Sequence, residues 1–392
     1  MTSLQVSNSS PSPPQMDYSQ HTDDTSSDTG FTDITSHSIQ TTQTDSSINE
    51  STLHQRYSYH KLSTINEVEN WYTVADRYGF IEENIKEPTD REKEKEAERA
   101  TKWANMTKPT LINGTHDFEF SYKFIKRVYK GIPDSWRRDA WYYLCTDHLI
   151  KTQKDDTLKN TFETLLSQPT TNERQIDLDI PRTMHSHIMF RQRYGPGQCY
   201  LFNVLRAFAN YDTEVGYCQG MASIVAVLLM YFEEEKAFSL LVHMFERDNL
   251  HDLYIPGFPY LMKSFYIQEK LLKKFSPKLA NHMSEIGLTS DMFATRWYIT
   301  LFTGGVIPYQ TLLRVWDLYF LNGYDFFYCV GVALLIIHKN HLFACDLESS
   351  LSFLGGTISV SENSFIKLSK KLYDKCVSHN YITNYKNKYT NN

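Results

Sequence analysis

The sequence predicts an all-α fold with one large helical domain over residues 120–376 of the 392-residue chain. From Ser121 onward, apolar residues recur at helical spacing, beginning with Tyr122, Ile125, Val128 and Tyr129. Alternating patterns typical of strands are rare in this region. No repeat with the 30–47-residue period of helical solenoids is found, which favours a single bundle-like domain.

The first segment, residues 1–55, is rich in Ser, Thr, Asp and Gln and has few aromatic residues. Its first 50 residues contain seven acids and no Lys or Arg, whereas the whole chain has a net charge of -6. Such a composition buries too little apolar surface to offset the conformational entropy of the chain, so it predicts a disordered tail. The many hydroxyl groups fit a phosphorylated regulatory arm, and a passive tail is the alternative.

Residues 56–119 are predicted to form a segment that precedes the domain. The stretch Arg77-Tyr78-Gly79-Phe80-Ile81 places aromatic residues among charges, which indicates an element that docks on the main body. The run of mixed charges at 86–102 predicts a solvated helix. Residues 377–392 are expected to be a C-terminal tail.

Within the domain, Gly131-Ile132-Pro133 ends the first helix, and Pro133 suits the start of the next. Trp141, Trp297 and Trp316 are expected in the core because large aromatic residues at helical spacing usually pack there. Asn322-Gly323 fits the end of a helix. Further helices are predicted at 199–211, 219–234, 235–247, 261–275, 278–286, 295–303, 308–320, 324–340 and 365–375.

The composition argues against several classes of protein. The net charge suggests no nucleic-acid partner. The six cysteines have no spacing typical of a zinc site and are expected to be buried free thiols. The chain has no apparent signal peptide, and its longest apolar runs are too short to span a membrane. A cytoplasmic protein is therefore expected, with any peripheral association with endomembranes made through a partner.

One candidate motif is Ile176-Asp177-Leu178-Asp179-Ile180-Pro181-Arg182. Pro181 disfavours helix at Ile180, which predicts a turn there. Arg182 can project from this turn while Asp179 holds it through a charge-assisted hydrogen bond. The alternative is a purely structural Asp–Arg pair at the entry of a helix.

A second motif is Val215-Gly216-Tyr217-Cys218-Gln219-Gly220-Met221. The two glycines permit unusual backbone torsions or a close approach of another segment. Gln219 could then present its amide outward from a tight turn before the helix predicted next. The alternative is that Gln219 caps that helix or bonds a neighbouring carbonyl.

Together, these motifs offer a fixed positive charge and a neutral amide. Transfer of a phosphoryl group requires positive charge over the transferring oxygens and a polar group that orients the attacking water. Arg182 suits the first task and Gln219 the second, since an amide both donates and accepts hydrogen bonds. The chain has no GxxxxGK[ST] loop of its own, so such a pair would act on a nucleotide that another protein holds.

Over residues 120–345 the chain resembles the TBC-domain (Tre-2/Bub2/Cdc16) family of GTPase-activating proteins for Rab GTPases. The matching residues are Gly131-Ile132-Pro133 with Arg137 and Trp141, Ile176, Asp179 and Arg182 of an Ile-x-x-Asp-x-x-Arg motif, Tyr217 and Gln219 of a Tyr-x-Gln motif, and Trp316-Asp317 with Gly323. Arg138 departs from the family pattern, which often has a small residue or proline there. The segments at 76–80 and 254–259 resemble those of the RN-tre-like branch.

The resemblance implies a helical domain that works with two fingers. Arg182 would be the arginine finger against the γ-phosphate, and Gln219 the glutamine finger that positions water. Ile176, Asp179 and Tyr217 would support them. The protein would activate a GTPase rather than turn over a substrate of its own. It would have no cofactor, because GTP and Mg²⁺ belong to a Rab partner in the GTP state, and it would regulate vesicle trafficking.

Two alternative hypotheses are a TBC-shaped module that binds a GTPase without catalysis and a helical scaffold unrelated to this family. His185 and His187 are expected to be surface or second-layer residues, because the implied mechanism needs no protein base. Arg191 and Arg193 are expected either to contact the GTPase or to be solvated.

Overall fold

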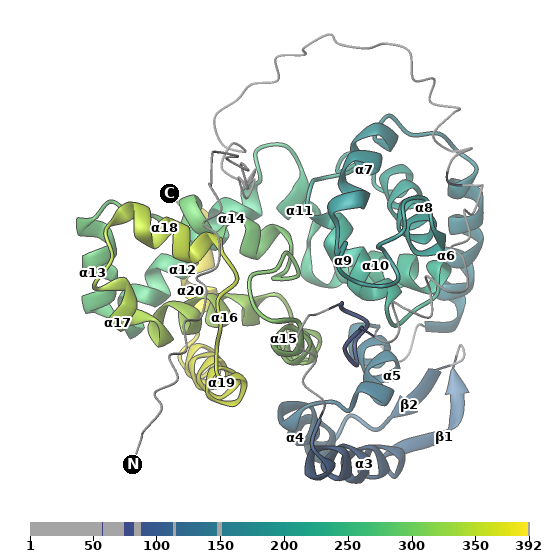
Figure 1. Cartoon of the computed structure of the whole chain (residues 1–392), viewed down its shortest axis with the longest axis horizontal. Coiled ribbons are helices and arrows are strands. Elements are labelled where there is room, and N and C mark those ends of the chain that lie inside the picture. Colours follow the sequence, from purple (N-terminus) through teal and green to yellow (C-terminus); the bar gives the residue numbers. More distant parts are fainter. Residues whose placement is uncertain (1–56, 58–73, 82–87, 113–114, 147–150, 391–392) are drawn as a thin grey trace, which may run out of the picture. The chain divides into compact units, whose positions relative to one another are not determined.

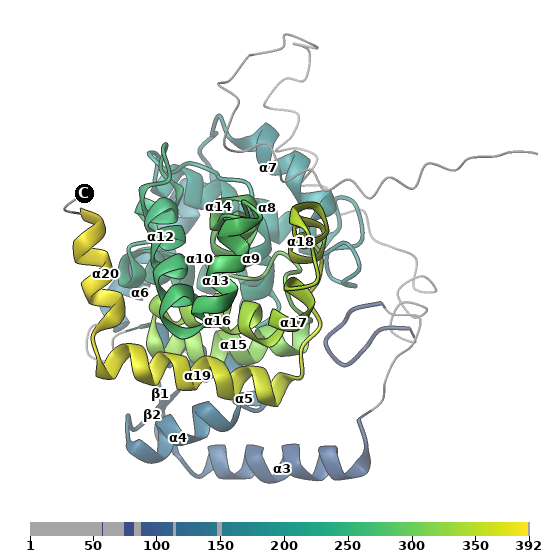
Figure 2. The same cartoon turned by 90° about the vertical axis from the view of Figure 1, so that its left-hand side faces the viewer.

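The structure is a computed structural model that describes residues 57, 74–81, 88–112, 115–146 and 151–390. The predicted all-α fold is confirmed, because helices dominate this part of the chain and its named strands form one two-stranded sheet. The acidic tail predicted at 1–55 lies outside the described residues. Figures 1 and 2 show the helices from two directions.

The first described elements precede the main helical body. Helix α3 is the charged helix predicted from the mixed-charge run, and Trp103 is its buried side chain. An antiparallel hairpin follows and packs on α5. The elements are α3 (Asp90–Ala104), β1 (Thr107–Ile112), β2 (Thr115–Phe118), α4 (Tyr122–Lys130) and α5 (Asp134–Cys145).

The hairpin was not predicted, although the sequence contains a signal for it. Asn113-Gly114 stands between the two strands in the chain, and this dipeptide favours a two-residue hairpin turn. These two residues lie outside the described part of the chain. The strands also contain Pro109, which weakens a strand pattern read from sequence alone.

The apolar face predicted for α4 is partly wrong. Phe124 and Val128 are fully buried, whereas Tyr122 is 79% exposed. Ser121 caps the helix, so Tyr122 is its first residue. The helix packs instead through Phe124, whose ring meets those of Trp103 and Phe118.

The next group of helices forms around α8 and α10 (Figure 1). Helices α6, α8 and α10 contact one another in pairs, and α9 packs on both α8 and α10. Every residue of α9 except Ser223 is buried and apolar, as expected for a helix enclosed by others. The group comprises α6 (Lys151–Leu166), α7 (Glu173–Asp179), the 3₁₀ turn η1 (Ile180–Arg182), α8 (Pro196–Tyr211), α9 (Met221–Leu229) and α10 (Glu234–Asp248).

The remaining helices pack around α12 and α16, and α19 lies along α16. The predicted C-terminal tail contains α20, which contacts α12 and buries Ile382. Figure 2 shows α19 and α20 in yellow. The group comprises α11 (His251–Tyr254), α12 (Pro259–Phe275), α13 (Pro277–Glu285), α14 (Ser290–Ile299), α15 (Tyr309–Asn322), α16 (Asp325–Ile337), α17 (Lys339–Leu342), α18 (Leu347–Gly355), α19 (Glu362–Ser378) and α20 (Tyr381–Thr390).

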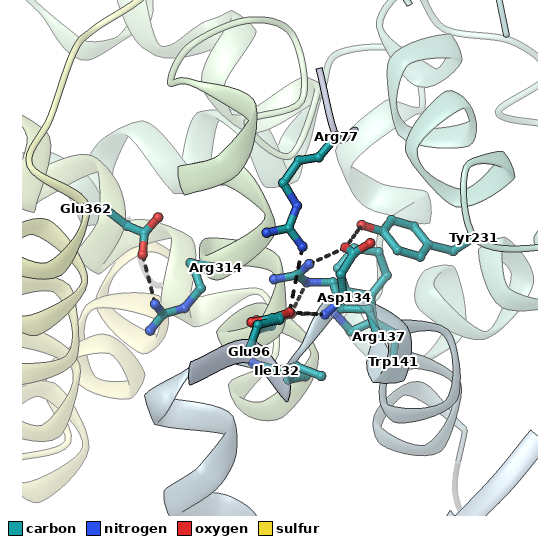
Figure 3. A network of polar contacts seen from close by, with 10 residues as sticks. Arg77, Glu96, Ile132, Asp134, Arg137, Trp141, Tyr231, Arg314 and Glu362 are labelled. Atoms are coloured by element: carbon teal, nitrogen blue, oxygen red, sulfur yellow. Dashed lines mark hydrogen bonds and ion pairs between the residues drawn. The ribbon is translucent and has the colours of Figure 1, made fainter. Parts of the chain in front are cut away.

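Helix α15 joins the early and late helices through the buried carboxylate of Asp317. This carboxylate accepts hydrogen bonds from Trp141 Nε1 at 2.9 Å and Arg137 Nε at 3.1 Å. It also accepts one from the backbone N–H of Ile132 at 3.1 Å. Figure 3 shows these three donors close together. The residues that opened the family resemblance therefore fasten α5 to α15.

Trp141, Trp297 and Trp316 are all fully buried, as predicted. Gly323 ends α15 with a φ of 78°, which confirms the predicted helix stop. The cysteines are free thiols, of which Cys218 and Cys345 are only partly buried. Within the described ranges, no helix has both the length and the apolar character needed to cross a bilayer.

Candidate functional site

The first motif forms the end of α7 and the turn η1. Ile176 is fully buried, and a buried ion pair between Glu173 and Arg206 joins α7 to α8 with 2.7 Å between Oε1 and Nε. The α-helix ends at Asp179 and a turn begins at Ile180, as predicted, but Ile180 keeps helical torsions (φ -56°, ψ -48°) that Pro181 was expected to disfavour. The chain tightens into this 3₁₀ turn over Ile180–Arg182 and becomes extended at Thr183.

Asp179 connects the two sequence motifs. Its Oδ1 accepts a hydrogen bond from Arg182 Nη2, three residues later. Its Oδ2 accepts a hydrogen bond of 2.5 Å from the hydroxyl of Tyr217, 38 residues away. Asp179 is 2% exposed at the side chain, whereas Arg182 is 57% exposed. A buried carboxylate thus holds the base of an arginine whose side chain reaches solvent.

The second motif forms a tight turn before α9, and both glycines have positive φ. Gly216 has a φ of 57°, and a Cβ there would lie 2.8 Å from Asn172 Oδ1 at the start of α7. Gly220 has a φ of 106°, and a Cβ there would lie 2.8 Å from Ile299 Cγ2 at the end of α14. The glycines therefore allow close approach on both sides of the turn, as the sequence suggested.

Gln219 lies in this turn and is partly buried. Gly220 occupies the N-cap position of α9, and no side chain caps that helix end. Within the described part of the chain, no hydrogen bond joins the Gln219 side-chain amide to another residue. The alternative role for Gln219, as a helix cap or a partner of a neighbouring carbonyl, is not realised, so its amide is available to water or a ligand.

Burial and the negative charge of Asp179 set the protonation of the groups between the motifs. Burial, together with that carboxylate, holds the pKa of Tyr217 well above its ordinary value. The same two causes raise the pKa of the Cys218 thiol to about 12. Both groups are therefore protonated near neutral pH, and Tyr217 is fixed as the donor to Asp179.

The histidines and arginines that follow Arg182 in the sequence differ in their exposure. His185 is exposed and His187 is buried, which agrees with surface and second-layer roles. Arg191 is exposed. Arg193 is neither free nor fully solvated, because its guanidinium pairs with Asp177 at 2.5 Å. Spacing along the chain gave no signal for this pair, which forms only when α7 packs beside the loop before α8.

The site contains charged and polar groups that could bind an external phosphate. Among the described residues, no cluster of three or more His, Cys, Asp or Glu side chains could hold a metal ion. The exposed guanidinium of Arg182 and the amide of Gln219 can contact anionic oxygens and water.

Comparison with known proteins gives one consistent result. Residues 134–343 match the Rab-GTPase-TBC domain family. The chain is 37% identical over 295 residues to a TBC domain-containing protein of Schizosaccharomyces pombe, covering 73% of this chain and 70% of that protein. It is 34% identical over 231 residues to the Rab GTPase-activating protein tbc-11 of Caenorhabditis elegans, covering 59% of this chain and 24% of that longer protein.

Two solved structures share the fold. The Ypt/Rab-GAP domain of Gyp1p has a TM-score of 0.59 and 21% identity, and the match covers 72% of this chain and 99% of that one. The Chlamydomonas flagellar RabGAP TBC domain also has a TM-score of 0.59, with 23% identity and 77% and 99% coverage.

Proposed function

This chain belongs to the Rab-GTPase-TBC domain family, and we propose that it accelerates GTP hydrolysis by a Rab-family GTPase through Arg182 and Gln219. The observation that carries the proposal is the shared carboxylate of Asp179. This carboxylate accepts hydrogen bonds from Arg182 itself and from Tyr217, which is two residues before Gln219. The two candidate fingers therefore emerge from segments that one buried group fastens together.

Each finger has a distinct task in this mechanism. The guanidinium of Arg182 enters the partner's nucleotide site and stabilises the negative charge that develops on the phosphoryl oxygens. The Gln219 amide accepts a hydrogen bond from the attacking water and donates one to an oxygen beside it. No protein base is required. GTP and Mg²⁺ are held by the partner in its GTP state.

The surroundings favour these tasks over structural ones. Asp179 orients Arg182 from behind while most of its side chain remains accessible. Ile176 anchors α7 in the core, and Tyr217 fixes the turn that carries Gln219. Because the partner holds the nucleotide, the protein would act wherever that GTPase is located. At membranes that carry the GTPase, it would thereby regulate vesicle trafficking.

The test is single-turnover GTP hydrolysis by a panel of purified Rab proteins with the full chain. Arg182→Ala should reduce the stimulated rate by a factor on the order of 10³–10⁵. Gln219→Ala should reduce it by about 10²–10³, as loss of a preorganised polar group does. Arg174→Ala is the matched control, because Arg174 is an exposed arginine on α7, the helix that leads into η1, and it should retain the rate.

The outcomes separate activation from simple binding. Stimulation of no Rab in a full panel would refute the proposed activity. Stimulation that persists in Arg182→Ala would refute the finger assignment. Selective binding of a GTP-loaded Rab without any change in rate would instead identify a TBC-shaped binding module.

A further inference from the structure

A tyrosine upstream of the matched region, Tyr57, is buried beside α7, the helix that leads into the turn carrying Arg182. The ring of Tyr57 stacks on Phe202 of α8, with 4.0 Å between ring centroids and 7° between planes. Its hydroxyl donates a 2.6 Å hydrogen bond to Asp177 Oδ1 on α7. Arg193 completes the group, because Nη1 donates to the Tyr57 hydroxyl at 2.9 Å and Nη2 pairs with Asp177. Tyr57 therefore joins α7 to α8.

A second upstream stretch, residues 75–81, binds the loop that follows Arg182. The N–H of Ile81 donates to the carbonyl of Ser186, and the N–H of Ile188 donates to the carbonyl of Gly79, both at 2.9 Å. His187 Nε2 donates to the carbonyl of Tyr78 at 2.8 Å. A Cβ at Gly79 would lie 2.6 Å from this imidazole nitrogen, so only glycine permits the contact.

The same stretch is also attached to the helical scaffold. The rings of Tyr78 and Phe80 pack against Tyr309, the first residue of α15. Arg77 pairs with Glu96 of α3 at 3.8 Å, and Glu96 Oε1 accepts the backbone N–H of Asp134 at the start of α5. Figure 3 shows Arg77 directed toward Glu96. Residues 75–81 thus bridge the scaffold and the loop after the finger.

Building on the proposed function, we propose that Tyr57 and residues 75–81 are positioning elements for the arginine finger. They fasten the chain five residues before Arg182, at Asp177, and four residues after it, at Ser186. Both lie upstream of residues 134–343, where the family match falls. In this chain the working catalytic unit therefore includes residues that precede the matched domain.

The physical need for this support follows from the local structure. Arg182 ends a three-residue 3₁₀ turn, and its own side chain is bonded to Asp179 alone among the described residues. So short a turn has few internal hydrogen bonds, and its position depends on what holds its flanks. A displacement of about 1 Å can cost about 10² in rate when a catalytic group must meet a reacting centre.

The experiment measures single-turnover GTP hydrolysis by a responsive Rab over a range of concentrations of the full chain. Tyr57→Ala and Phe80→Ala should each lower the maximal rate by about 10-fold to 10²-fold. The concentration for half-maximal rate should change little, because Arg182 is displaced while the rest of the docking surface is retained. Val74→Ala, an exposed change beside the second stretch, is the control and should retain the full rate.

A double-mutant cycle separates positioning from general stability. If Tyr57 acts through Arg182, Tyr57→Ala should have no further effect in an Arg182→Ala background. Ile382→Ala, which removes a buried side chain from α20, is the control for lost stability and should retain the maximal rate at a temperature where the protein is folded. Independent, additive losses from Tyr57→Ala and Arg182→Ala would overturn the proposal.

Failure of this inference is distinguishable from failure of the proposed function. A wild-type chain that stimulates no Rab rejects both. A wild-type chain that stimulates a Rab, with Tyr57→Ala and Phe80→Ala equally active, rejects the positioning role alone. If either alanine variant fails to fold, Tyr57→Phe serves as the test instead, because it removes only the hydroxyl oxygen that bonds Asp177 and Arg193. Faster hydrogen exchange at Thr183 and Ile188 in that variant supports the proposal, and unchanged exchange overturns it.

Discussion

The hydroxyl of Tyr217 donates a hydrogen bond to the buried carboxylate of Asp179, which also bonds Arg182. Tyr217 and Asp179 are 38 residues apart in the chain and belong to different motifs. Neither motif alone distinguishes a structural residue from a catalytic one. Their junction at one carboxylate places the exposed guanidinium of Arg182 and the side-chain amide of Gln219, which has no hydrogen-bond partner among the described residues, on adjoining segments.

Tyr217→Phe should weaken both stability and activation. The substitution removes one of the two side-chain donors to Asp179, and leaving a buried acceptor with fewer hydrogen bonds costs about 1–3 kcal/mol. Urea unfolding and single-turnover GTP hydrolysis measure the two effects. Tyr211→Phe changes an exposed tyrosine near the same turn and is the control. Equal unfolding free energies and equal hydrolysis rates for the two variants would contradict the proposed role of the Tyr217 hydroxyl.

Gly220→Ala should destabilise the protein more than Gly287→Ala. Both glycines have positive φ, so alanine is strained at either position by about 1–2 kcal/mol. At Gly287 the new Cβ would meet nothing within 4 Å, whereas at Gly220 it would lie 2.8 Å from Ile299 Cγ2. Thermal unfolding of both variants measures the difference. A Gly220→Ala variant no less stable than Gly287→Ala would show that the turn before α9 can shift freely.

Asp317→Ala should be among the most destabilising single substitutions in this domain. It leaves the buried guanidinium of Arg137 without its buried carboxylate, and breaking such a pair costs about 3–5 kcal/mol. Asp374→Ala is the control, since its pair with Lys370 is exposed and worth less than about 1 kcal/mol. Chemical unfolding compares the variants, and similar losses from both would argue against a joining role for Asp317.

Stability should fall on mild acidification because of His187. Burial lowers the pKa of His187, although the Tyr78 carbonyl and the Asp76 charge oppose this effect. The unfolded chain therefore takes up the proton first, near pH 6.5. The contribution of neutral His187 to the free energy of unfolding is complete above that pH. It declines as the pH falls through the lower pKa that His187 has in the folded protein.

The His187 prediction is measured as the difference in unfolding free energy between wild type and His187→Gln from pH 7.5 to 5.5. The other 13 of the 14 histidines are present in both proteins, so their titrations cancel to first order in this difference. The advantage of wild type should shrink on acidification, because a protonated imidazole can no longer accept the Met189 N–H at Nδ1. A difference in unfolding free energy that stays constant or grows at low pH would contradict the predicted role of His187.

Local sequence patterns predicted elements well where one signal dominates. Gly323 stops α15 because its φ of 78° is open to glycine, and Pro133 precedes α5 because a helix start does not need its N–H. Patterns failed where packing decides. Tyr122 has the helical spacing of Ile125 and Val128, yet it lies at the exposed start of α4. Pro181 was expected to move Ile180 away from helical torsions, but Ile180 keeps them, because the chain turns there as a 3₁₀ helix.

The sequence by itself determined the helical class, most core helices and the two motifs, because periodicity, glycine and proline act over a few residues. Only the tertiary structure decided that Asp179 serves both motifs, that Arg193 pairs with Asp177, and that Tyr57 and residues 75–81 flank Arg182. These relations depend on how α7, α8 and the upstream segments pack. Contacts between residues far apart in the chain leave no periodic trace in one sequence, since each partner alone also fits an ordinary structural role.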